Sequence, residues 1–288
     1  RDRSHFDGQD VLESGMTAPG HTESGWMNRF LSALPQAQAA STKGLGVGGV
    51  TPLVMRGQMP VLGWAPATLK AADADLPPRL LGLYQATDPL LTGVLTEAIA
   101  TGKIVGADKG MVSANGGPGD PQTMVAMAQG AARLLAEPDG PRVAALAFEG
   151  WDTHAQETQR LARLLQGLDN ALAAFETGLG SAWKDTAILV VTEFGRTVAV
   201  NGTGGTDHGT ATVAFLTGGA VKGGRVITDW PGLKPANLYQ ARDLKPTTDI
   251  RSVMKGLMAG LYDTPENRLA SDIFPESASA KPMTGLII

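Results

Sequence analysis

Residues 143–192 read VAALAFEGWDTHAQETQRLARLLQGLDNALAAFETGLGSAWKDTAILVVT, a strand pattern, a helix pattern and a second strand pattern in succession. The apolar runs Val143–Phe148 and Ala187–Thr192 have the length and composition of buried strands. Between them, from about residue 155 to residue 178, large apolar side chains recur at helical spacing, namely Leu161, Leu164, Leu165, Leu168, Leu172 and Phe175. Such a crossover normally joins parallel strands with right-handed geometry. We therefore expect an α/β protein with one main sheet.

The composition fits a soluble globular protein and excludes several classes. Of the 288 residues, 43% are hydrophobic and 18% are charged, and no apolar run approaches the ~20 residues of a membrane span. A net charge of −4 and the absence of a Lys/Arg block argue against nucleic acid as a partner. Because the chain has no cysteine, disulfides and thiolate metal ligands are excluded.

The chain is expected to form one domain over residues 1–288, with a looser part between Pro66 and Gly119. Helical pieces are predicted around Arg79–Tyr84 and Asp88–Thr101, followed by a glycine-rich segment. This composition is typical of an excursion or lid. Residues 66–119 are therefore predicted to lie outside the core.

The N-terminal segment carries a hydroxyl and an imidazole at the start of a predicted helix, Phe6–Glu13. The Ser4 hydroxyl would face the backbone N–H groups of that helix, a suitable place for a nucleophile that attacks phosphate or sulfate. The plainer alternative, which the residues alone favour, is that Ser4 only caps the helix. The chain begins at Arg1 without an initiator methionine or a signal peptide, which suggests a processed or incomplete piece of a longer product.

Acids and imidazoles follow both predicted strands of the crossover. Asp152 and His154 come shortly after the first strand, and Glu193 comes directly after the second. A glycine-rich loop then carries Asp207 and His208 into a further apolar run. Ligands of open parallel sheets gather beyond the carboxyl ends of the strands, so these side chains are expected to converge. Asp, Glu and His form the ligand set of a divalent metal centre.

Each of these groups also has a structural explanation. Asp152 would cap the following helix, and Glu193 would pair with Arg196 as a loop acid. The loop around Asp207 and His208 would be a surface turn. The glycines beside this pair nevertheless allow close backbone approach, and two of the four histidines fall in these strand-end loops, which favours the metal site.

Five motifs in fixed order carry a family resemblance over essentially the whole chain: SHFDGQDVLESG, GWDTH, TEFGRT, GTDHGTATVAFLTGGAVKGG and PTTDIRSV. They resemble the bacterial family catalogued as domain of unknown function 1501, whose members commonly carry a twin-arginine export signal. That family is similar in turn to the alkaline phosphatase and sulfatase superfamily. The resemblance implies an exported, periplasmic protein with a mainly parallel sheet sandwiched between helices. The family's usual first strand is missing here, which fits an N-terminal truncation.

The resemblance also implies roles for individual residues. Asp152, His154 and His208 resemble superfamily metal ligands, and Glu193 falls where the superfamily has the Asp of an Asp-His pair. Phe194 falls where it has the His, so one expected ligand is absent. The complete set of predicted metal ligands is Asp152, His154, Glu193, Asp207 and His208.

The resemblance places catalytic and substrate-binding groups beside these ligands. Ser4 lies near the nucleophile position, and His5 competes for the same place. Arg196 is expected to clamp the oxygens of the substrate, and Thr197 to add a hydrogen bond. The imidazole-rich ligands favour Zn²⁺ or Mn²⁺, with Ca²⁺ also open.

These expectations together describe a metal-dependent hydrolase of phosphate or sulfate esters, acting on an anionic small-molecule or glycan ester. The first alternative is a catalytically inactive, exported binding or envelope-associated protein that keeps the fold. A second alternative is a metal-independent hydrolase that uses Ser4, Asp207 and one histidine, either His154 or His208.

Overall fold

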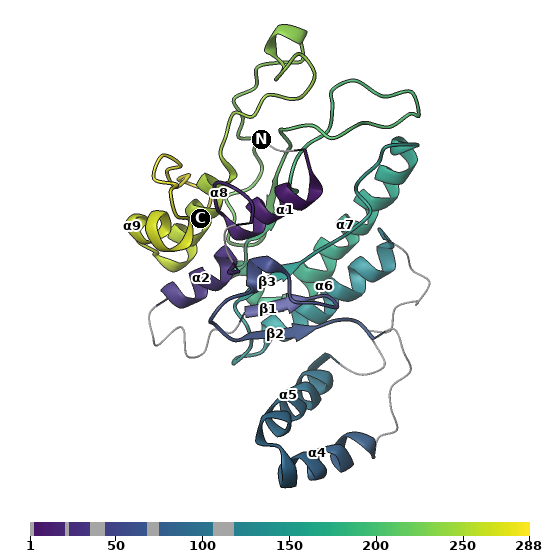
Figure 1. Cartoon of the computed structure of the whole chain (residues 1–288), viewed down its shortest axis with the longest axis vertical. Coiled ribbons are helices and arrows are strands. Elements are labelled where there is room, and N and C mark those ends of the chain that lie inside the picture. The colour runs from purple at the N-terminus through teal and green to yellow at the C-terminus, as the bar shows by residue number, and fades with distance from the viewer. Residues whose placement is uncertain (1–2, 21–22, 35–43, 68–74, 106–117) are drawn as a thin grey trace.

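The computed structural model describes residues 3–20, 23–34, 44–67, 75–105 and 118–288. A small parallel sheet lies in the middle of the molecule with helices on both sides, and a pair of helices stands at one end (Figure 1). In the described part of the chain, no helix combines the length and the apolar character needed to cross a bilayer.

The helices and strands follow one another mostly as the hydrophobic periodicity predicts. The described strands are β1 (Gly44–Val47), β2 (Val61–Trp64), β3 (Val143–Leu146), β4 (Ile188–Val190) and β5 (Phe215–Thr217). The described α-helices are α1 (His5–Ser14), α2 (Trp26–Ala33), α4 (Leu76–Thr87), α5 (Pro89–Val105), α6 (Pro121–Ala136), α7 (Glu157–Leu179), α8 (Ile250–Tyr262) and α9 (Glu266–Arg268). Short 3-10 turns cover Leu53–Met55, Gly180–Asp185 and Pro235–Asn237, and a π-helical turn covers Leu269–Ile273.

The described strands form two sheets, which differs from the expected single main sheet. Strands β2, β1 and β3 form a parallel sheet in that order, and β4 pairs antiparallel with β5. The long helix α7 is confirmed, but it does not return the chain to a strand beside β3. The apolar run that contains β4 finds its partner later in the chain, where Leu189 lies opposite Leu216.

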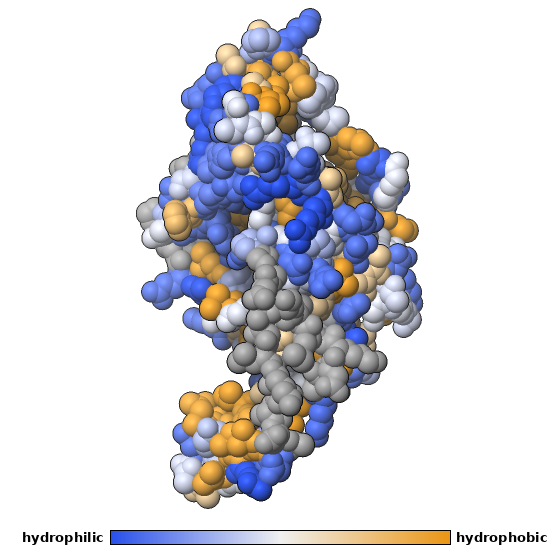
Figure 2. Space-filling model, turned by 90° about the vertical axis from the view of Figure 1, so that its right-hand side faces the viewer, coloured by the Kyte–Doolittle hydropathy of each residue, from blue (hydrophilic) through white to orange (hydrophobic). Residues whose placement is uncertain are grey.

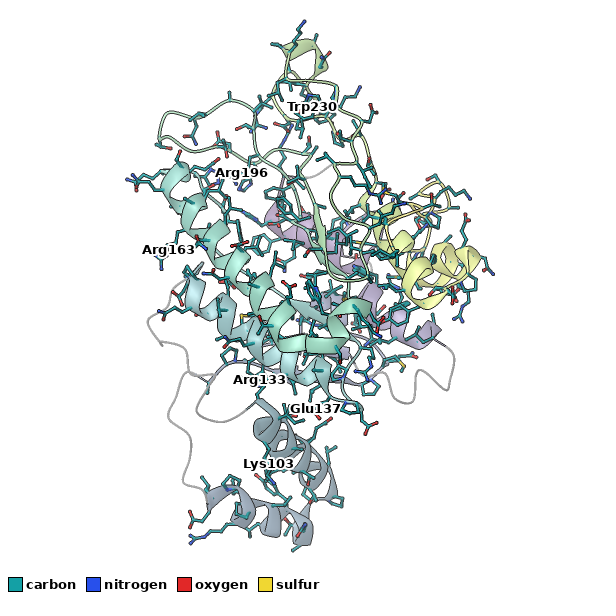
Figure 3. The ribbon with its side chains drawn as sticks, turned by 180° about the vertical axis from the view of Figure 1, so that it is seen from behind. Lys103, Arg133, Glu137, Arg163, Arg196 and Trp230 are labelled. Atoms are coloured by element: carbon teal, nitrogen blue, oxygen red, sulfur yellow. The ribbon has the colours of Figure 1, made fainter. Side chains whose placement is uncertain are left out.

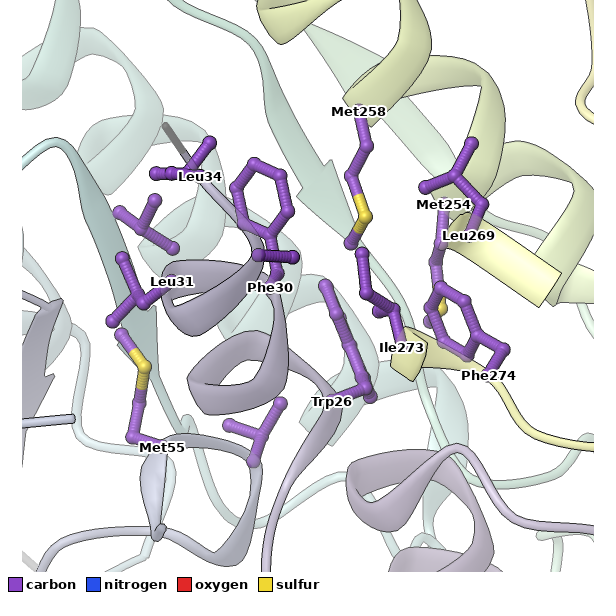
Figure 4. Close-up of a cluster of buried hydrophobic side chains, with 13 residues drawn as sticks. Trp26, Phe30, Leu31, Leu34, Met55, Met254, Met258, Leu269, Ile273 and Phe274 are labelled. Carbon is purple, nitrogen blue, oxygen red and sulfur yellow. The ribbon is translucent and has the colours of Figure 1, made fainter. Parts of the chain in front are cut away.

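The parallel sheet is covered by helices on both faces, which confirms the α/β class. Alternate side chains of a strand point to opposite faces. Leu45 and Val47 of β1 pack in a core with α6 and α7, whereas Val143 of β3 packs in a second core with α2 and α8. Figure 4 shows this second core, where Phe30 of α2 lies near Met258 of α8.

The helix ends use the capping residues that the sequence offers. The Ser4 side chain accepts a hydrogen bond from the Asp7 N–H at the start of α1, and the helix ends at Gly15 in the left-handed conformation. Asp120 accepts from the Thr123 N–H at 2.9 Å and starts α6. Asp249 does the same for α8, as predicted.

The described part of the predicted excursion, residues 75–105, forms α4 and α5. These two helices pack on each other and reach the body mainly through the end of α5, where Arg133 of α6 donates to the Val105 carbonyl. Figure 3 places Lys103 of α5 in the lower part of the molecule and Arg196 in the upper part, with Arg133 between them. Most of the predicted glycine-rich segment lies outside the described residues, and the lid role stays a prediction.

Candidate metal centre

Three imidazoles from separate parts of the chain converge on the Asp152 carboxylate. His5 is the first residue of α1, Asp152 and His154 follow β3, and His208 lies in the loop before β5. The Nε2 atom of His5 lies 3.3 Å from Asp152 Oδ2. The Nε2 atoms of His154 and His208 lie 2.9 and 3.1 Å from Asp152 Oδ1. One carboxylate therefore faces three ring nitrogens.

The other nitrogen of each ring, Nδ1, faces a group that accepts hydrogen bonds. The pairs are His5 with Glu193 Oε1 at 2.7 Å, His154 with Asp207 Oδ1 at 3.1 Å, and His208 with the Arg3 carbonyl at 2.8 Å. A carbonyl oxygen cannot donate, so Nδ1 of His208 carries the hydrogen, and ionised carboxylates impose the same tautomer on the other two rings. In the neutral rings, all three Nε2 lone pairs point toward Asp152.

This arrangement favours a positive charge between the rings, which a bound cation or a ring proton can supply. A neutral Nε2 lone pair that faces a carboxylate oxygen is repelled by it, and the Nε2 atoms of His154 and His208 are only 3.1 Å apart. Ligands about 2.0–2.1 Å from a tetrahedral Zn²⁺ lie about 3.3 Å from one another. The Nε2 and carboxylate separations match that spacing, and the ligand atoms of His5, Asp152 and His208 all lie within 4.8 Å of one another. These residues fit a divalent cation, with hydrogen-bonded outer nitrogens that orient the rings.

Phe194 forms the wall of the site. Its buried ring lies 4.8 Å from the His5 ring and 4.7 Å from the His208 ring, centroid to centroid. The side chain that takes the place of an expected ligand thus packs against two histidines and limits their movement.

Arg196 supplies the cation that Asp152 contacts in this structure. Its Nη1 donates to Asp152 Oδ1 at 2.5 Å, and its Nε donates to the Thr206 hydroxyl at 3.0 Å. Its Nη2 also donates to the Thr206 carbonyl. The Thr206 hydroxyl donates in turn to Glu157 Oε2 at 2.5 Å. The guanidinium is therefore held on two edges beside the carboxylate.

The charges of the site shift its pKa values. Burial raises the pKa of Asp152, but hydrogen bonds from Arg196 and His5 and the charges of Arg196 and His154 outweigh it and lower the pKa to about 2. The hydrogen bond to Glu193 raises the pKa of His5 above its usual range, although burial opposes this. The carboxylate is thus ionised at all ordinary pH values, while His5 holds its proton more strongly than a free imidazole does.

Metal affinity is consequently expected to rise with pH through the raised pKa of His5. Below that pKa a cation must displace the proton on Nε2, so each pH unit is expected to change the dissociation constant about tenfold. Above it the lone pair is free, and the dependence flattens. Isothermal titration of Zn²⁺ between about pH 6 and pH 8 measures this slope, which should be shallower in His5→Gln, where only the other imidazoles compete for protons. An affinity of the wild-type protein that does not change with pH would contradict the assignment of His5 as a ligand.

Two glycines let the loop reach the site, as the sequence predicts. A Cβ atom at Gly205 would lie 2.4 Å from the His154 carbonyl oxygen, and one at Gly209 would lie 2.5 Å from the Arg196 carbonyl oxygen. No other residue type fits at these distances without a shift of the backbone. The close approach brings His208 opposite Arg196 in a short antiparallel bridge.

The structure brings the predicted site residues together in two layers. Asp152, His154 and His208 form the inner group, as predicted, together with His5, which the sequence suggested as a substrate contact. Glu193 and Asp207, predicted as ligands, bind the outer nitrogens of His5 and His154.

The remaining predicted residues lie beside this group. Thr197 is buried, and its hydroxyl donates to the Ala199 carbonyl and accepts from the Asp207 N–H. Ser4 caps α1 directly before His5. Their catalytic and substrate-binding roles stay predictions. Thr206 and Glu157, which support Arg196, were not predicted, and no pattern in the local sequence marks them.

One comparison with known proteins gives a match. A family model described as "Protein of unknown function (DUF1501)" matches residues 2–269, a range that contains the whole candidate site. No curated protein and no solved structure matches the chain.

Proposed function

The chain belongs to the DUF1501 family of proteins of unknown function, and we propose from its site that it is a metal-dependent hydrolase of phosphate or sulfate esters. The convergence of three histidine Nε2 atoms on Asp152 supports this proposal most strongly. A nitrogen-rich group with one carboxylate favours Zn²⁺ or Mn²⁺ over Ca²⁺. A cation held by these residues supplies Lewis-acid chemistry to an ester oxygen.

The protein's own groups bind and orient the substrate. Arg196 is held in place by Thr206 and presents a planar guanidinium beside the cation site, which suits the non-bridging oxygens of a phosphate or sulfate group. Ser4 stands at the positive end of α1, next to His5, where an attacking hydroxyl and an anionic group are both favoured. We assign Ser4 as the nucleophile and Arg196 as the group that clamps the substrate.

The resemblance to the alkaline phosphatase and sulfatase superfamily supports the same reaction. It extends the proposal to that fold type and to export from the cytoplasm. The small parallel sheet between helices and the strand-end loops that build the site agree with such a fold at the level of class.

Hydrolysis of aryl phosphate and aryl sulfate esters tests the proposal. The protein is expected to hydrolyse at least one of the two after loading with Zn²⁺ or Mn²⁺, and to lose this activity on chelation. Arg196→Lys is expected to lower kcat/KM about 100-fold, because it removes the planar pair of donors. The matched control, Arg163→Lys on the exposed face of α7, should leave kcat/KM unchanged.

The alternative function gives a different result. A protein that binds metal stoichiometrically but hydrolyses neither ester under any metal condition would contradict the hydrolase proposal. That outcome would support the exported binding protein. Hydrolysis that survives chelation would instead support the metal-independent enzyme.

A further inference from the structure

The hairpin of α4 and α5, residues 76–105, exposes apolar side chains along both helices. No residue of α4 is buried, and only Thr101 and Val105 of α5 are. Figure 2 shows the hairpin as a largely hydrophobic region at one end of the molecule. Its exposed large apolar side chains are Leu76, Leu83, Leu90, Leu91, Val94 and Ile104.

Helices with this much exposed apolar surface need a packing partner to be stable. The two helices have 12 and 17 residues, close to the length of about 12–15 residues below which an isolated helix is marginal in water. Their stability must come from packing, and two helices alone cannot bury an apolar stripe on the outer side of each. Among the described residues, the hairpin meets the body mainly where the end of α5 contacts α6.

The charges of the hairpin indicate which partner fits. Residues 76–105 contain only four charged side chains, Arg79, Asp88, Glu97 and Lys103, so their net charge is zero. A helix that binds an anionic bilayer carries an excess of Lys and Arg on its polar face, which this hairpin lacks. A strongly charged partner would meet no excess of opposite charge on the hairpin. A surface with equal charges of both signs is compatible with a second copy of itself in a two-fold arrangement.

Three glycines support close approach of other helices. A Cβ atom at Gly82, Gly93 or Gly102 would meet nothing within 4 Å. Each glycine inside a helix costs about 0.5–1 kcal/mol relative to alanine, and nothing in the described part of the chain requires it at these positions. Bare backbone at these points lets a neighbouring helix approach more closely than a side chain would allow.

We propose that the α4–α5 hairpin is a self-association surface, through which two copies of the chain form a four-helix bundle. Hairpin pairing covers the exposed leucines of both copies in the manner of helix bundles. Two helices about 18 and 26 Å long present less than the ~800 Å² that each partner contributes to a standard stable interface. The dimer is therefore expected to form at micromolar concentrations. This proposal is independent of the metal site.

Sedimentation velocity over about 1–200 µM tests the proposal. The wild-type protein is expected to change from a 29.9 kDa monomer to a dimer across this range. Leu90→Glu, at a side chain that is 76% exposed, should stay monomeric throughout. The control Val226→Glu, at a side chain that is 88% exposed outside the hairpin, should dimerise like the wild type.

Three outcomes would overturn the proposal. The first is a wild-type protein that stays monomeric at every concentration. The second is a Leu90→Glu protein that dimerises as strongly as the wild type, which would place the interface elsewhere. The third is a monomer that floats with neutral phosphatidylcholine vesicles while Leu90→Glu does not, which would make lipid the occupant. Cooperative thermal unfolding of all three proteins shows that they are folded.

Discussion

Replacing Asp152 with Asn is expected to lower the affinity for Zn²⁺ by at least about 100-fold. The substitution keeps the shape of the side chain but removes the charge on which His5, His154 and His208 converge. Loss of an outer hydrogen-bond partner alone typically costs 10–100-fold in metal affinity, so loss of the central ligand should cost more. Isothermal titration calorimetry at one pH and ionic strength measures the effect.

An aspartate outside the site provides the control. Asp185 is 77% exposed, and its nearest basic group, Lys184 Nζ, is 4.0 Å away, so Asp185→Asn should bind Zn²⁺ like the wild type. Cooperative thermal unfolding of both variants would show that the fold is intact. Equal Zn²⁺ affinity in Asp152→Asn and the wild type would show that any bound cation lies elsewhere.

Replacing Lys255 with Met is expected to destabilise the fold by about 1–3 kcal/mol. Lys255 is 1% exposed, and its Nζ donates to the carbonyls of Ser277 and Ala280, which fastens the C-terminal segment to α8. Methionine fills a similar volume but leaves the Ala280 carbonyl without a donor, at about 1–3 kcal/mol. The Ser277 carbonyl keeps the hydrogen bond from the Ala280 N–H at 3.0 Å. Chemical denaturation measures the loss in free energy of unfolding.

Lys281→Met is the matched control. Lys281 is 73% exposed and pairs with Glu266 at 2.8 Å, and such surface pairs contribute about 0–1 kcal/mol. The difference between the two variants should therefore be several-fold. A Lys255→Met protein as stable as the Lys281→Met protein would show that the Ala280 carbonyl finds another donor.

Local sequence signals predicted the helices well. The leucine spacing between residues 155 and 178 identified α7, and Asp120 and Asp249 marked the starts of α6 and α8. These signals depend on neighbours three or four residues apart, so the sequence contains them directly. The short apolar stretch Thr51–Met55 suggests an extended piece, but Pro52 leads instead into a 3-10 turn over Leu53–Met55.

Strand pairing could not be read in the same way. The apolar run Ala187–Thr192 identifies a strand, but nothing within it says which strand it joins. β4 pairs with β5, which begins at Phe215. The apolar pair Val226 and Ile227 also suggests a short strand up to Asp229, but these residues form none. Pairing is decided by contacts between distant segments, which a pattern within one segment does not record.

The site residues that follow a predicted strand could be identified from the sequence. Asp152, His154 and His208 were expected together and lie together, because the loops after β3 and β4 meet. His5 was not predicted as a metal ligand. Its position in the site depends on how α1 packs against Phe194, which is almost 190 residues away in the sequence. Glycine at position 8 permits that packing, because a Cβ atom there would lie 3.2 Å from the Phe194 ring.

X-ray absorption at the Zn edge, on wild-type protein loaded with Zn²⁺ and freed of excess metal, tests the cation site most directly. We expect one Zn²⁺ per chain, surrounded by nitrogen and oxygen ligands with the scattering pattern of at least two imidazoles. Protein that retains no stoichiometric Zn²⁺, or Zn²⁺ bound by oxygen alone, would contradict the assignment of His5, Asp152 and His208 as its ligands.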